Sequence, residues 1–277
     1  MYYYYYLRPP ERLALAAMRA RRSGIRALFL EGPPGTGKTS LGYYLAQQIG
    51  GKVVYYLCHP WTTDEELFVG VDVGAVAAGV ERPADAYRPG ALLRAVEISH
   101  SSPAVLILDE LDKAPPRVDA LLLDFLQEGR VHGSRGEEYR GRLDALFVMV
   151  TTNGVRPLSE PLLRRGMRVR LDFLPPNVEA DILRHRTGAP TGAIRLTVRM
   201  ANVIRRRGET TPSLQEMICL LEDLNVAGGP EDVEVLLRGW LVKTPADWKA
   251  LTEELKNPAA ALWGEWQRGR RGEHGSP

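Results

Sequence analysis

A glycine-rich loop between a short apolar run and a helical pattern constrains the fold of this 277-residue chain more than any other feature. The apolar run is RALFLEG (26–32), and it leads into GPPGTGKT, a full match to the pattern G-x-x-x-x-G-K-[ST]. Glycines let backbone N–H groups curl around phosphate oxygens, and the helix that follows presents its positive N-terminus to them. The sequence therefore predicts a strand, a phosphate-binding loop and a helix in succession.

Each residue type in this loop has an expected task in binding a nucleotide. Lys38 should reach the β- and γ-phosphates, and the hydroxyl of Thr39 should ligate Mg²⁺. An ordinary glycine-rich turn is the alternative, and the strand before and helix after the loop count against it. The residues expected to surround the nucleotide are Gly32, Pro33, Pro34, Gly35, Thr36, Gly37, Lys38, Thr39 and Ser40.

Further apolar runs alternate with helical patterns through the first two-thirds of the chain. Near-continuous apolar strands separated by helices indicate a parallel sheet that is covered on both faces. We therefore expect an α/β fold, a P-loop NTPase αβα sandwich with a parallel five-stranded sheet. The other four strands are expected at 52–57, 104–110, 145–153 and 167–173, with helices at 38–49, 90–99 and 116–128. Thr63 and Glu66 form a capping box that predicts one more short helix.

After Pro175 and Pro176 the pattern changes to helices and loops without a convincing strand. We read this part as a small C-terminal helical domain, joined to the sheet domain at the Pro-Pro hinge. The Tyr-rich start, MYYYYYLRPP, is expected to pack on the sheet domain as an ordered arm. The predicted parts are an N-terminal arm and helix (1–24), a nucleotide-binding core (25–174), the helical lid with C-terminal helices (175–268) and a disordered tail (269–277).

Composition limits the function classes without selecting one. The chain is 44% hydrophobic and 25% charged, with a formal charge of +2, which is ordinary for a globular protein and gives no general argument for nucleic acid or membrane. No stretch reaches the roughly 18 apolar residues that span a bilayer. Cys58 and Cys219 are far apart and lack a metal-binding spacing. With no signal-peptide pattern at the start, we expect a cytoplasmic protein.

Two acidic residues follow the apolar run at 105–108. Asp109 is expected to hold Mg²⁺ through its water shell, and Glu110 is placed to polarise an attacking water, so the site should hydrolyse its ligand. Asp112 is expected to be a solvated charge or a helix-start acid. A further strand ends in Thr151, Thr152 and Asn153, whose polar side chains could orient the water beside Glu110.

In this order and spacing, GPPGTGKT, LILDELDKA, VMVTTN and LSEPLLRRG resemble the AAA+ ATPases. Within them, YRPGALLRAV (87–96) and LLLDFLQEGRVHG (121–133) resemble the MoxR-like, dynein-related branch. The resemblance spans about residues 25–225. It implies an αβα core with a helical lid, assembly into a homo-oligomeric ring, expected to be a hexamer, and ATP-driven remodelling of a protein client. It also implies that Asn153 is the polar sensor residue.

The same resemblance suggests a task for two adjacent arginines. In such rings an arginine from the neighbouring subunit stabilises the charge on the transferring γ-phosphoryl group. The family pattern, set on LSEPLLRRG (158–166), places this finger at Arg165, with Arg164 as the reserve candidate. Gly166 stands where relatives carry an aromatic residue, which leaves the choice between the neighbours open. Solvated surface arginines are the alternative.

One further residue departs from the pattern of the AAA+ ATPases, and two segments are candidates to contact a client. Gln215 stands where relatives carry a sensing arginine in the lid, and Arg199 is a candidate substitute. The segments 69–89, expected to be mobile, and 129–142, expected to be a charged hairpin with a solvated His132, are candidates to meet a client. The basic runs at 205–207 and 268–271 are expected to be a solvated helix end and a tail.

The leading hypothesis is a ring-forming, Mg²⁺-dependent ATPase that hydrolyses ATP to ADP and phosphate at subunit interfaces and remodels a protein or protein assembly. A nucleic-acid motor or loader is one alternative, supported only by the short basic runs. The other is an ATP-gated assembly scaffold with little turnover, against which Glu110 and Asn153 argue.

Overall fold

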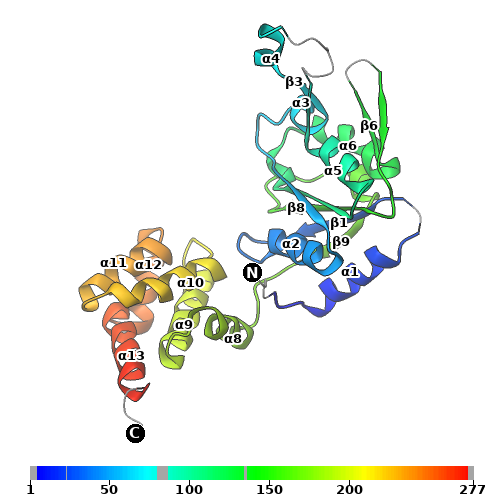
Figure 1. Cartoon of the computed structure of the whole chain (residues 1–277). Coiled ribbons are helices and arrows are strands. Elements are labelled where there is room, and N and C mark those ends of the chain that lie inside the picture. The colour runs from blue at the N-terminus through cyan, green and yellow to red at the C-terminus, as the bar shows by residue number, and fades with distance from the viewer. Residues whose placement is uncertain (1–4, 23, 80–86, 134–135, 274–277) are drawn as a thin grey trace. The chain divides into compact units, whose positions relative to one another are not determined.

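The computed structural model describes residues 5–22, 24–79, 87–133 and 136–273 and divides the chain into two compact units (Figure 1). The first unit comprises Met1–Gly32 and Gly37–Leu171, and the second comprises Pro33–Thr36 and Asp172–Pro277. The predicted boundary between residues 174 and 175 lies three residues beyond this division.

A five-stranded sheet forms the centre of the first unit. Its strand order is β2-β5-β8-β1-β9, and every pair of neighbours is parallel. This confirms the predicted parallel sheet and its αβα fold class. The strands are β1 (Arg26–Glu31), β2 (Lys52–Leu57), β5 (Ala104–Asp109), β8 (Leu146–Thr152) and β9 (Met167–Arg170).

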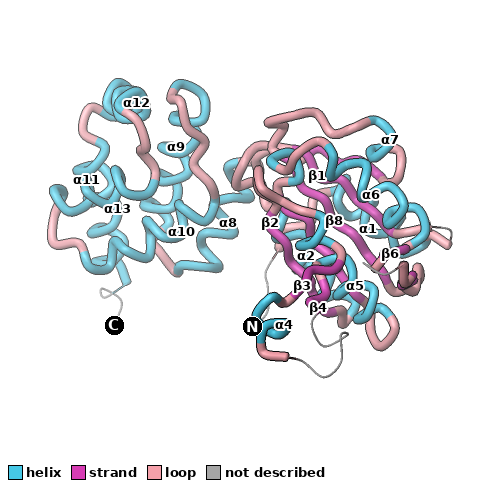
Figure 2. The backbone as a smooth tube through the Cα atoms, turned by 90° about the horizontal axis from the view of Figure 1, so that it is seen from above, coloured by secondary structure: helices cyan, strands magenta, loops and turns pink. Residues whose placement is uncertain are grey.

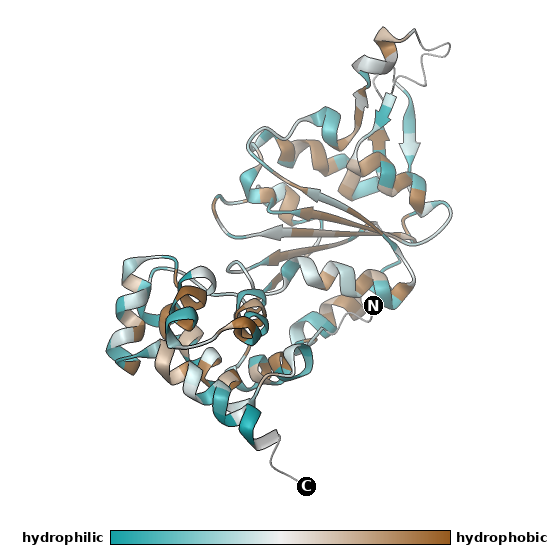
Figure 3. Cartoon of the chain, turned by 60° about the vertical axis from the view of Figure 1, so that its left-hand side comes forward, coloured by the Kyte–Doolittle hydropathy of each residue, from teal (hydrophilic) through white to brown (hydrophobic). Residues whose placement is uncertain are grey.

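Helices cover both faces of this sheet, as its continuous apolar strands require (Figures 1 and 2). Along β1, Leu28 and Leu30 pack with α1 and α2, whereas Ala27 and Phe29 pack in the core shared with α5 and α6. The central strands β5 and β8 are buried along their whole length, and the middle of the sheet is hydrophobic in Figure 3. The helices are α1 (Pro9–Ala20), α2 (Lys38–Ile49), α5 (Ala91–Ser99), α6 (Arg117–Glu128) and the short α7 (Glu160–Leu163), with a 3₁₀ turn, η2 (Leu111–Lys113).

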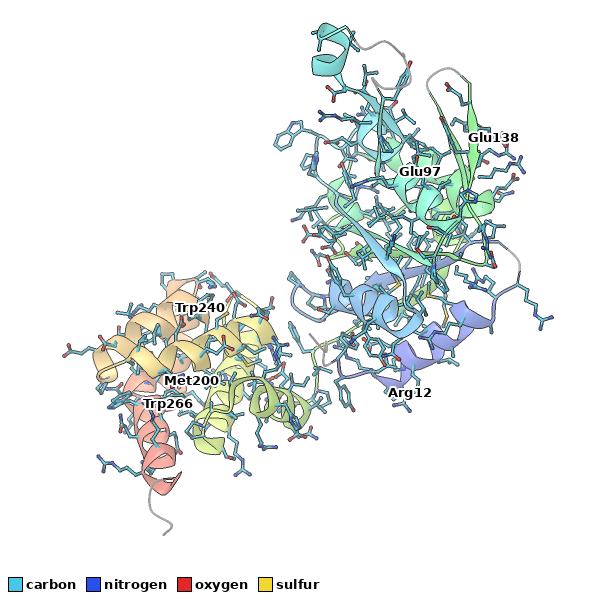
Figure 4. All side chains as sticks on the ribbon, viewed as in Figure 1. Arg12, Glu97, Glu138, Met200, Trp240 and Trp266 are labelled. Carbon is cyan, nitrogen blue, oxygen red and sulfur yellow. The ribbon has the colours of Figure 1, made fainter. Side chains whose placement is uncertain are left out.

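Two small antiparallel ladders extend from the sheet domain. The charged hairpin predicted at 129–142 is confirmed as β6 (Arg130–His132) paired with β7 (Glu138–Arg140). Glu138 is labelled on it in Figure 4, as is Glu97 on α5. The segment 69–89 contains β3 (Val69–Val71), α4 (Val73–Ala77) and β4 (Tyr87–Pro89), after the capped helix α3 (Asp64–Leu67). Its predicted mobility stays a prediction, and residues 80–86 lie outside the described residues.

The second unit is helical, as predicted. Its core contains Met200, Leu237 and Trp266, all nearly inaccessible to solvent; Met200 and Trp266 are labelled in Figure 4. No helix in the described part of the chain is both long and apolar enough to cross a membrane. The helices are α8 (Pro176–Thr187), α9 (Thr191–Arg207), α10 (Leu214–Asp223), α11 (Pro230–Trp240), α12 (Pro245–Leu255) and α13 (Pro258–Glu273), with a 3₁₀ turn, η3 (Leu224–Val226).

The prediction that residues 205–207 are a solvated helix end is wrong for Arg205. Its side chain is 5% exposed, its Nη1 atom lies 2.9 Å from Oε1 of Glu179, and its guanidinium stacks over the ring of Phe173. It also donates to the carbonyl oxygen of Pro212. Arg205 therefore links the last turn of α9 to Glu179 in the first turn of α8, inside the second unit. The helical period turns it inward while Arg206 and Arg207 stay exposed.

The predicted disordered tail is wrong for residues 269–273, which continue α13. The helix is anchored by the buried Leu262 and Trp266. Beyond them, Arg268 pairs with Glu265 at 2.5 Å, and Arg270 lies over the ring of Trp266. These contacts extend the helix past the last core residue. Residues 274–277 of the predicted tail, like residues 1–4 of the predicted arm, lie outside the described residues.

Gly166 is required by a close approach between the start of β9 and the neighbouring strand β1. A Cβ atom at this position would lie 2.8 Å from the carbonyl oxygen of Ala27 and 2.8 Å from the ring of Phe29. The space that an aromatic residue would need is therefore taken by β1 and Phe29.

We expect Gly166→Ala to lower the free energy of unfolding of the first unit by about 1–3 kcal/mol, the usual cost of forcing extra atoms into a packed core. Denaturant unfolding followed by circular dichroism measures this change. Gly70→Ala is the matched control, because a Cβ atom there would make only ordinary contacts of 3.5 Å or more. Equal stability of the two variants would contradict the packing argument.

Candidate active site

The predicted phosphate loop and acidic residues lie at one edge of the sheet. The loop follows β1, Asp109 is the last residue of β5, and Thr152 is the last residue of β8. Strand β8 lies between β1 and β5 and is parallel to both. The carboxyl ends of three adjacent strands therefore meet, which is where open α/β sheets bind ligands.

The backbone of the loop has the conformation that its glycines allow. Gly35 and Gly37 have φ angles of +77° and +90°, which side chains with a Cβ atom rarely adopt. Gly32 is buried before the turn, whereas Pro34 is exposed at it. The hydroxyl of Thr36 donates to the carbonyl oxygen of Pro33 at 2.9 Å and closes the turn. Ser40 is half-buried in the first turn of α2.

Lys38 is the first residue of α2, and its side chain is buried. Its ammonium donates to the carbonyl oxygen of Gly32 at 2.7 Å, so the side chain folds back along the loop. Burial lowers the pKa of Lys38, while the carboxylates of Asp109, Asp112 and Glu110 act in the opposite direction. This desolvated ammonium is suited to exchanging the carbonyl oxygen for a phosphate oxygen.

The carboxylate of Asp109 is the polar centre of the site. Its Oδ1 atom accepts hydrogen bonds from the hydroxyls of Thr39 at 2.8 Å and Thr151 at 2.6 Å. Its Oδ2 atom accepts from the hydroxyl of Tyr55 at 3.0 Å. Tyr55 could not be predicted as a neighbour of Asp109, because no sequence pattern shows that the hydroxyl of a residue in β2 reaches the end of β5.

These oxygen atoms fit Mg²⁺. Thr39 and Asp109 supply a hydroxyl and a carboxylate, the hard ligands that Mg²⁺ prefers, and they already lie within hydrogen-bond distance. The described residues contain no cluster of three or more His, Cys, Asp or Glu side chains that could hold a metal ion alone.

Glu110 has a strained backbone and two side-chain partners. Its φ and ψ angles are 55° and 46°, in the left-handed region, which costs a residue other than glycine about 1–3 kcal/mol. The hydroxyl of Thr151 accepts from its backbone N–H at 2.8 Å. Its Oε1 atom accepts from Nδ2 of Asn153 at 2.8 Å, and its Oε2 atom lies 2.6 Å from Nζ of Lys113. The predicted proximity of Asn153 and Glu110 is present, and Lys113 is an unforeseen neighbour.

Asp112 is not a solvated charge, and it lies in the first turn of η2, as the alternative of a helix-start acid predicted. It is 2% exposed, and its Oδ2 atom accepts from the backbone N–H groups of Asn153 at 3.1 Å and Val155 at 2.8 Å. The 3₁₀ turn η2 folds this carboxylate under the loop that follows β8, where it satisfies two backbone donors. Asp112 therefore fixes the loop that carries Asn153.

Arg164 and Arg165 lie near the amino ends of the strands, whereas the phosphate loop lies at their carboxyl ends. They precede β9, whose Met167 is level with Leu28 in the parallel register, and Gly166 lies against Ala27. The loop begins five residues further along β1 than Ala27, a distance of roughly 16 Å along the strand. That distance is longer than an arginine side chain, so neither arginine reaches the phosphate loop of its own chain.

The two arginines differ in their surroundings. Arg164 is 71% exposed and pairs with Glu160 at 3.0 Å, one turn earlier. Arg165 is half-buried, and it has no side-chain hydrogen bond or ion pair to any described residue. The Nε atom of Arg165 is buried and has no hydrogen-bond partner among the described residues.

The lid candidates lie in the second unit. The side chain of Gln215 donates to the sulfur of Cys219 at 3.4 Å on α10. Arg199 pairs with Glu254 at 2.6 Å. A nucleotide-sensing role for either residue stays a prediction.

Comparisons with known proteins agree with this geometry. The model of the AAA domain, dynein-related subfamily, matches residues 27–166. The chain is 34% identical over 164 residues to a Lon protease of Frankia alni, covering 57% of this chain but 18% of that protease. It is 25% identical over 236 residues to the Holliday junction branch migration complex subunit RuvB of Methanoregula boonei, covering 82% of this chain and 62% of that subunit.

Solved structures resemble the fold. Two mutants of Thermotoga maritima RuvB superimpose with TM-scores of 0.51 and 0.52, at 20% and 19% sequence identity. They cover 88% and 90% of this chain and 68% and 70% of theirs. At this identity the likeness concerns the fold alone. The dynein-related part of the predicted resemblance is confirmed by the domain match, while its MoxR-like part stays a prediction. The chain belongs to the AAA domain family of the dynein-related subfamily, within the AAA+ ATPases.

Proposed function

We propose that this chain is a ring-forming ATPase that hydrolyses ATP at the boundary between two subunits and uses the cycle to remodel a protein or protein assembly. The observation that carries the proposal is the separation of Arg165 from the phosphate loop within one chain. A second copy placed head to tail would bring its Arg165 to that loop, and repetition of this contact closes a ring. We expect six subunits.

The residues at the sheet edge have distinct tasks in this proposal. Lys38 binds the β- and γ-phosphates, and Thr39 and Asp109 would hold Mg²⁺. When bound, Mg²⁺ neutralises charge on the phosphates. Asn153 lies 2.8 Å from the carboxylate of Glu110, so the two side chains can hold one water molecule between them and the γ-phosphate.

Glu110 accepts a proton from this water as hydrolysis proceeds. The water oxygen forms a bond to the γ-phosphorus while the bond to the β–γ bridging oxygen breaks, which yields ADP and phosphate. Arg165 of the neighbouring copy stabilises the charge on the transferring group.

Glu110→Gln should bind ATP and assemble like the unaltered protein but turn over at least about 100-fold more slowly, because the amide cannot accept the proton. Phosphate release measures turnover, and electron microscopy with a slowly hydrolysed ATP analogue measures assembly. Glu138→Gln on the exposed β6–β7 hairpin is the matched control and should retain full activity. Unchanged turnover of Glu110→Gln would place the base elsewhere, and an unaltered protein that assembles without turnover would favour an ATP-gated scaffold.

A nucleic-acid motor is a second candidate, favoured by the similarity to a branch migration subunit over 82% of the chain. The two candidate functions are separated by measuring ATP turnover of the protein alone, with single-stranded DNA and with double-stranded DNA. Protein remodelling predicts no stimulation by either DNA, whereas several-fold stimulation would support the motor.

A further inference from the structure

The second unit contains a groove that has no part in the proposed hydrolysis. It has a volume of about 630 Å³ and is lined by residues of α8 and α9, together with Glu254 of α12. Its apolar lining comes from Pro176, Ala180, Val198 and Val203. Every lining residue belongs to the second unit, so the groove exists without any contribution from the sheet domain.

The lining of the groove is also strongly basic. Five arginines line it, against two acidic residues, Asp181 and Glu254. Asp181 pairs with Arg184 at 2.8 Å, and Glu254 is shared by Arg199 at 2.6 Å and Arg207 at 3.2 Å. The remaining two arginines are Arg195 and Arg206.

Arg195 and Arg206 are exposed, and neither has a hydrogen bond or an ion pair to any described residue. Isolated exposed arginines are ordinary surface residues. These two are different because they flank an apolar lining together with three further arginines. The groove therefore combines unneutralised positive charge with apolar surface.

The spacing of the arginines indicates an elongated ligand. Arg195, Arg199, Asn202 and Arg206 follow one another at helical spacing along one side of α9. The eleven steps along α9 from Arg195 to Arg206 extend over roughly 16 Å, or three helical turns. Met200, labelled in Figure 4, marks the buried side of the same helix. A ligand must carry negative charge over a similar length to use both free arginines.

The lining distinguishes between two kinds of elongated anion. Single-stranded nucleic acids are held by aromatic side chains on which the bases stack. The lining contains no aromatic side chain among the described residues. An amphipathic helix instead lays an apolar face on the floor of a groove between two helices. If this helix carried glutamates beside its apolar face, their carboxylates would form ion pairs with the arginines that line the groove.

We propose that the groove between α8 and α9 is a docking site for an acidic amphipathic helix of a partner protein. The apolar face of the helix packs on Ala180, Val198 and Val203, and its carboxylates pair with Arg195 and Arg206 at the two ends of the groove. Docking does not require ATP hydrolysis, so this proposal and the proposed ATPase activity can fail independently.

A direct test uses a fluorescein-labelled helical peptide of 14 residues, with leucines along one face and glutamates beside them. Fluorescence anisotropy with the full chain should show binding that weakens with added salt. A peptide with lysine in place of every glutamate should not bind. Arg195→Ala combined with Arg206→Ala should weaken binding of the acidic peptide by about tenfold or more, because two charge pairs are lost.

The matched control is Arg186→Ala combined with Arg271→Ala, which removes the same charge from exposed positions of the second unit that do not line the groove. This control should bind the acidic peptide within about twofold of the unaltered protein, since only long-range charge is lost. Equal weakening in the two double variants, or equal binding of both peptides, would overturn the proposal.

Two other occupants give distinct results. If a labelled 14-mer of deoxythymidine binds more tightly than the acidic peptide and loses this affinity in Arg195→Ala/Arg206→Ala, the groove is a nucleic-acid site. If the acidic peptide does not bind while the same variant shifts self-association in analytical ultracentrifugation, the groove is an interface between copies. Either outcome contradicts the helix-docking assignment.

Discussion

Lys38→Ala should abolish ATP binding. The ammonium of Lys38 is desolvated and turned back to the carbonyl oxygen of Gly32, at 2.7 Å, at the start of the phosphate loop. A charge-assisted bond from a buried lysine to phosphate is one of the strong polar contacts in proteins, and alanine leaves the phosphates without it. We expect no measurable heat of ATP binding in isothermal titration calorimetry.

Lys52→Ala is the control for Lys38→Ala, because Lys52 is exposed at the start of β2, at the other end of the strands. It should bind ATP with the affinity of the unaltered protein. Circular dichroism of both variants checks that the sheet domain remains folded. ATP affinity near that of the unaltered protein in Lys38→Ala would show that the loop after β1 is not the nucleotide site.

Arg165→Ala should leave ATP binding largely intact while reducing turnover by a factor on the order of 10³ or more, the range for loss of an arginine finger. The guanidinium acts on charge that develops during phosphoryl transfer, so its removal affects hydrolysis and not ground-state binding. ATP affinity by calorimetry and turnover by phosphate release separate the two quantities.

Arg164→Ala is the internal comparison for this prediction. Arg164 is paired with Glu160 and largely exposed, so its loss should change turnover by less than about tenfold, as for a surface ion pair. If Arg164→Ala were the inactive variant and Arg165→Ala the active one, the finger would be the other arginine. If both variants were active, the two adjacent arginines would be surface residues without a part in hydrolysis.

The parts of the fold that the sequence could predict are those that depend on local patterns. The near-continuous apolar runs at β1, β5 and β8 become the three central strands, because buried parallel strands carry apolar residues on both faces. The glycines of the phosphate loop determine its backbone directly. Once the strands are parallel, Lys38, Asp109 and Asn153 must lie at one edge, so the centre of the site follows as well.

Features that depend on tertiary packing could not be predicted in this way. Asp112 and Arg205 look like surface charges along the chain, yet both are buried because distant groups satisfy them: two backbone N–H groups for Asp112, and Glu179 with Pro212 for Arg205. Likewise, the hydroxyl of Tyr55 reaches Asp109 only because β2 and β5 are neighbours in the sheet.

Pairing of strands also determines where the two arginines lie. Their distance from the phosphate loop is a property of the register between β1 and β9, which no sequence pattern contains. The sequence resemblance pointed to Arg165, and the register shows that its side chain does not reach the phosphate loop of its own chain. The absence of an aromatic residue after it follows from the close approach of Gly166 to Ala27.

The most direct test of an active site shared between two subunits is to mix two inactive proteins, Arg165→Ala and Glu110→Gln, and to measure phosphate release. An interface with Glu110 from an Arg165→Ala subunit and Arg165 from a Glu110→Gln subunit contains every catalytic group. Random assembly of an equal mixture makes about a quarter of the interfaces complete, so activity should return on mixing to about that fraction. Exchange of subunits is verified by energy transfer between labelled copies. If subunits exchange and the mixture stays inactive, the site is not completed by a neighbouring Arg165.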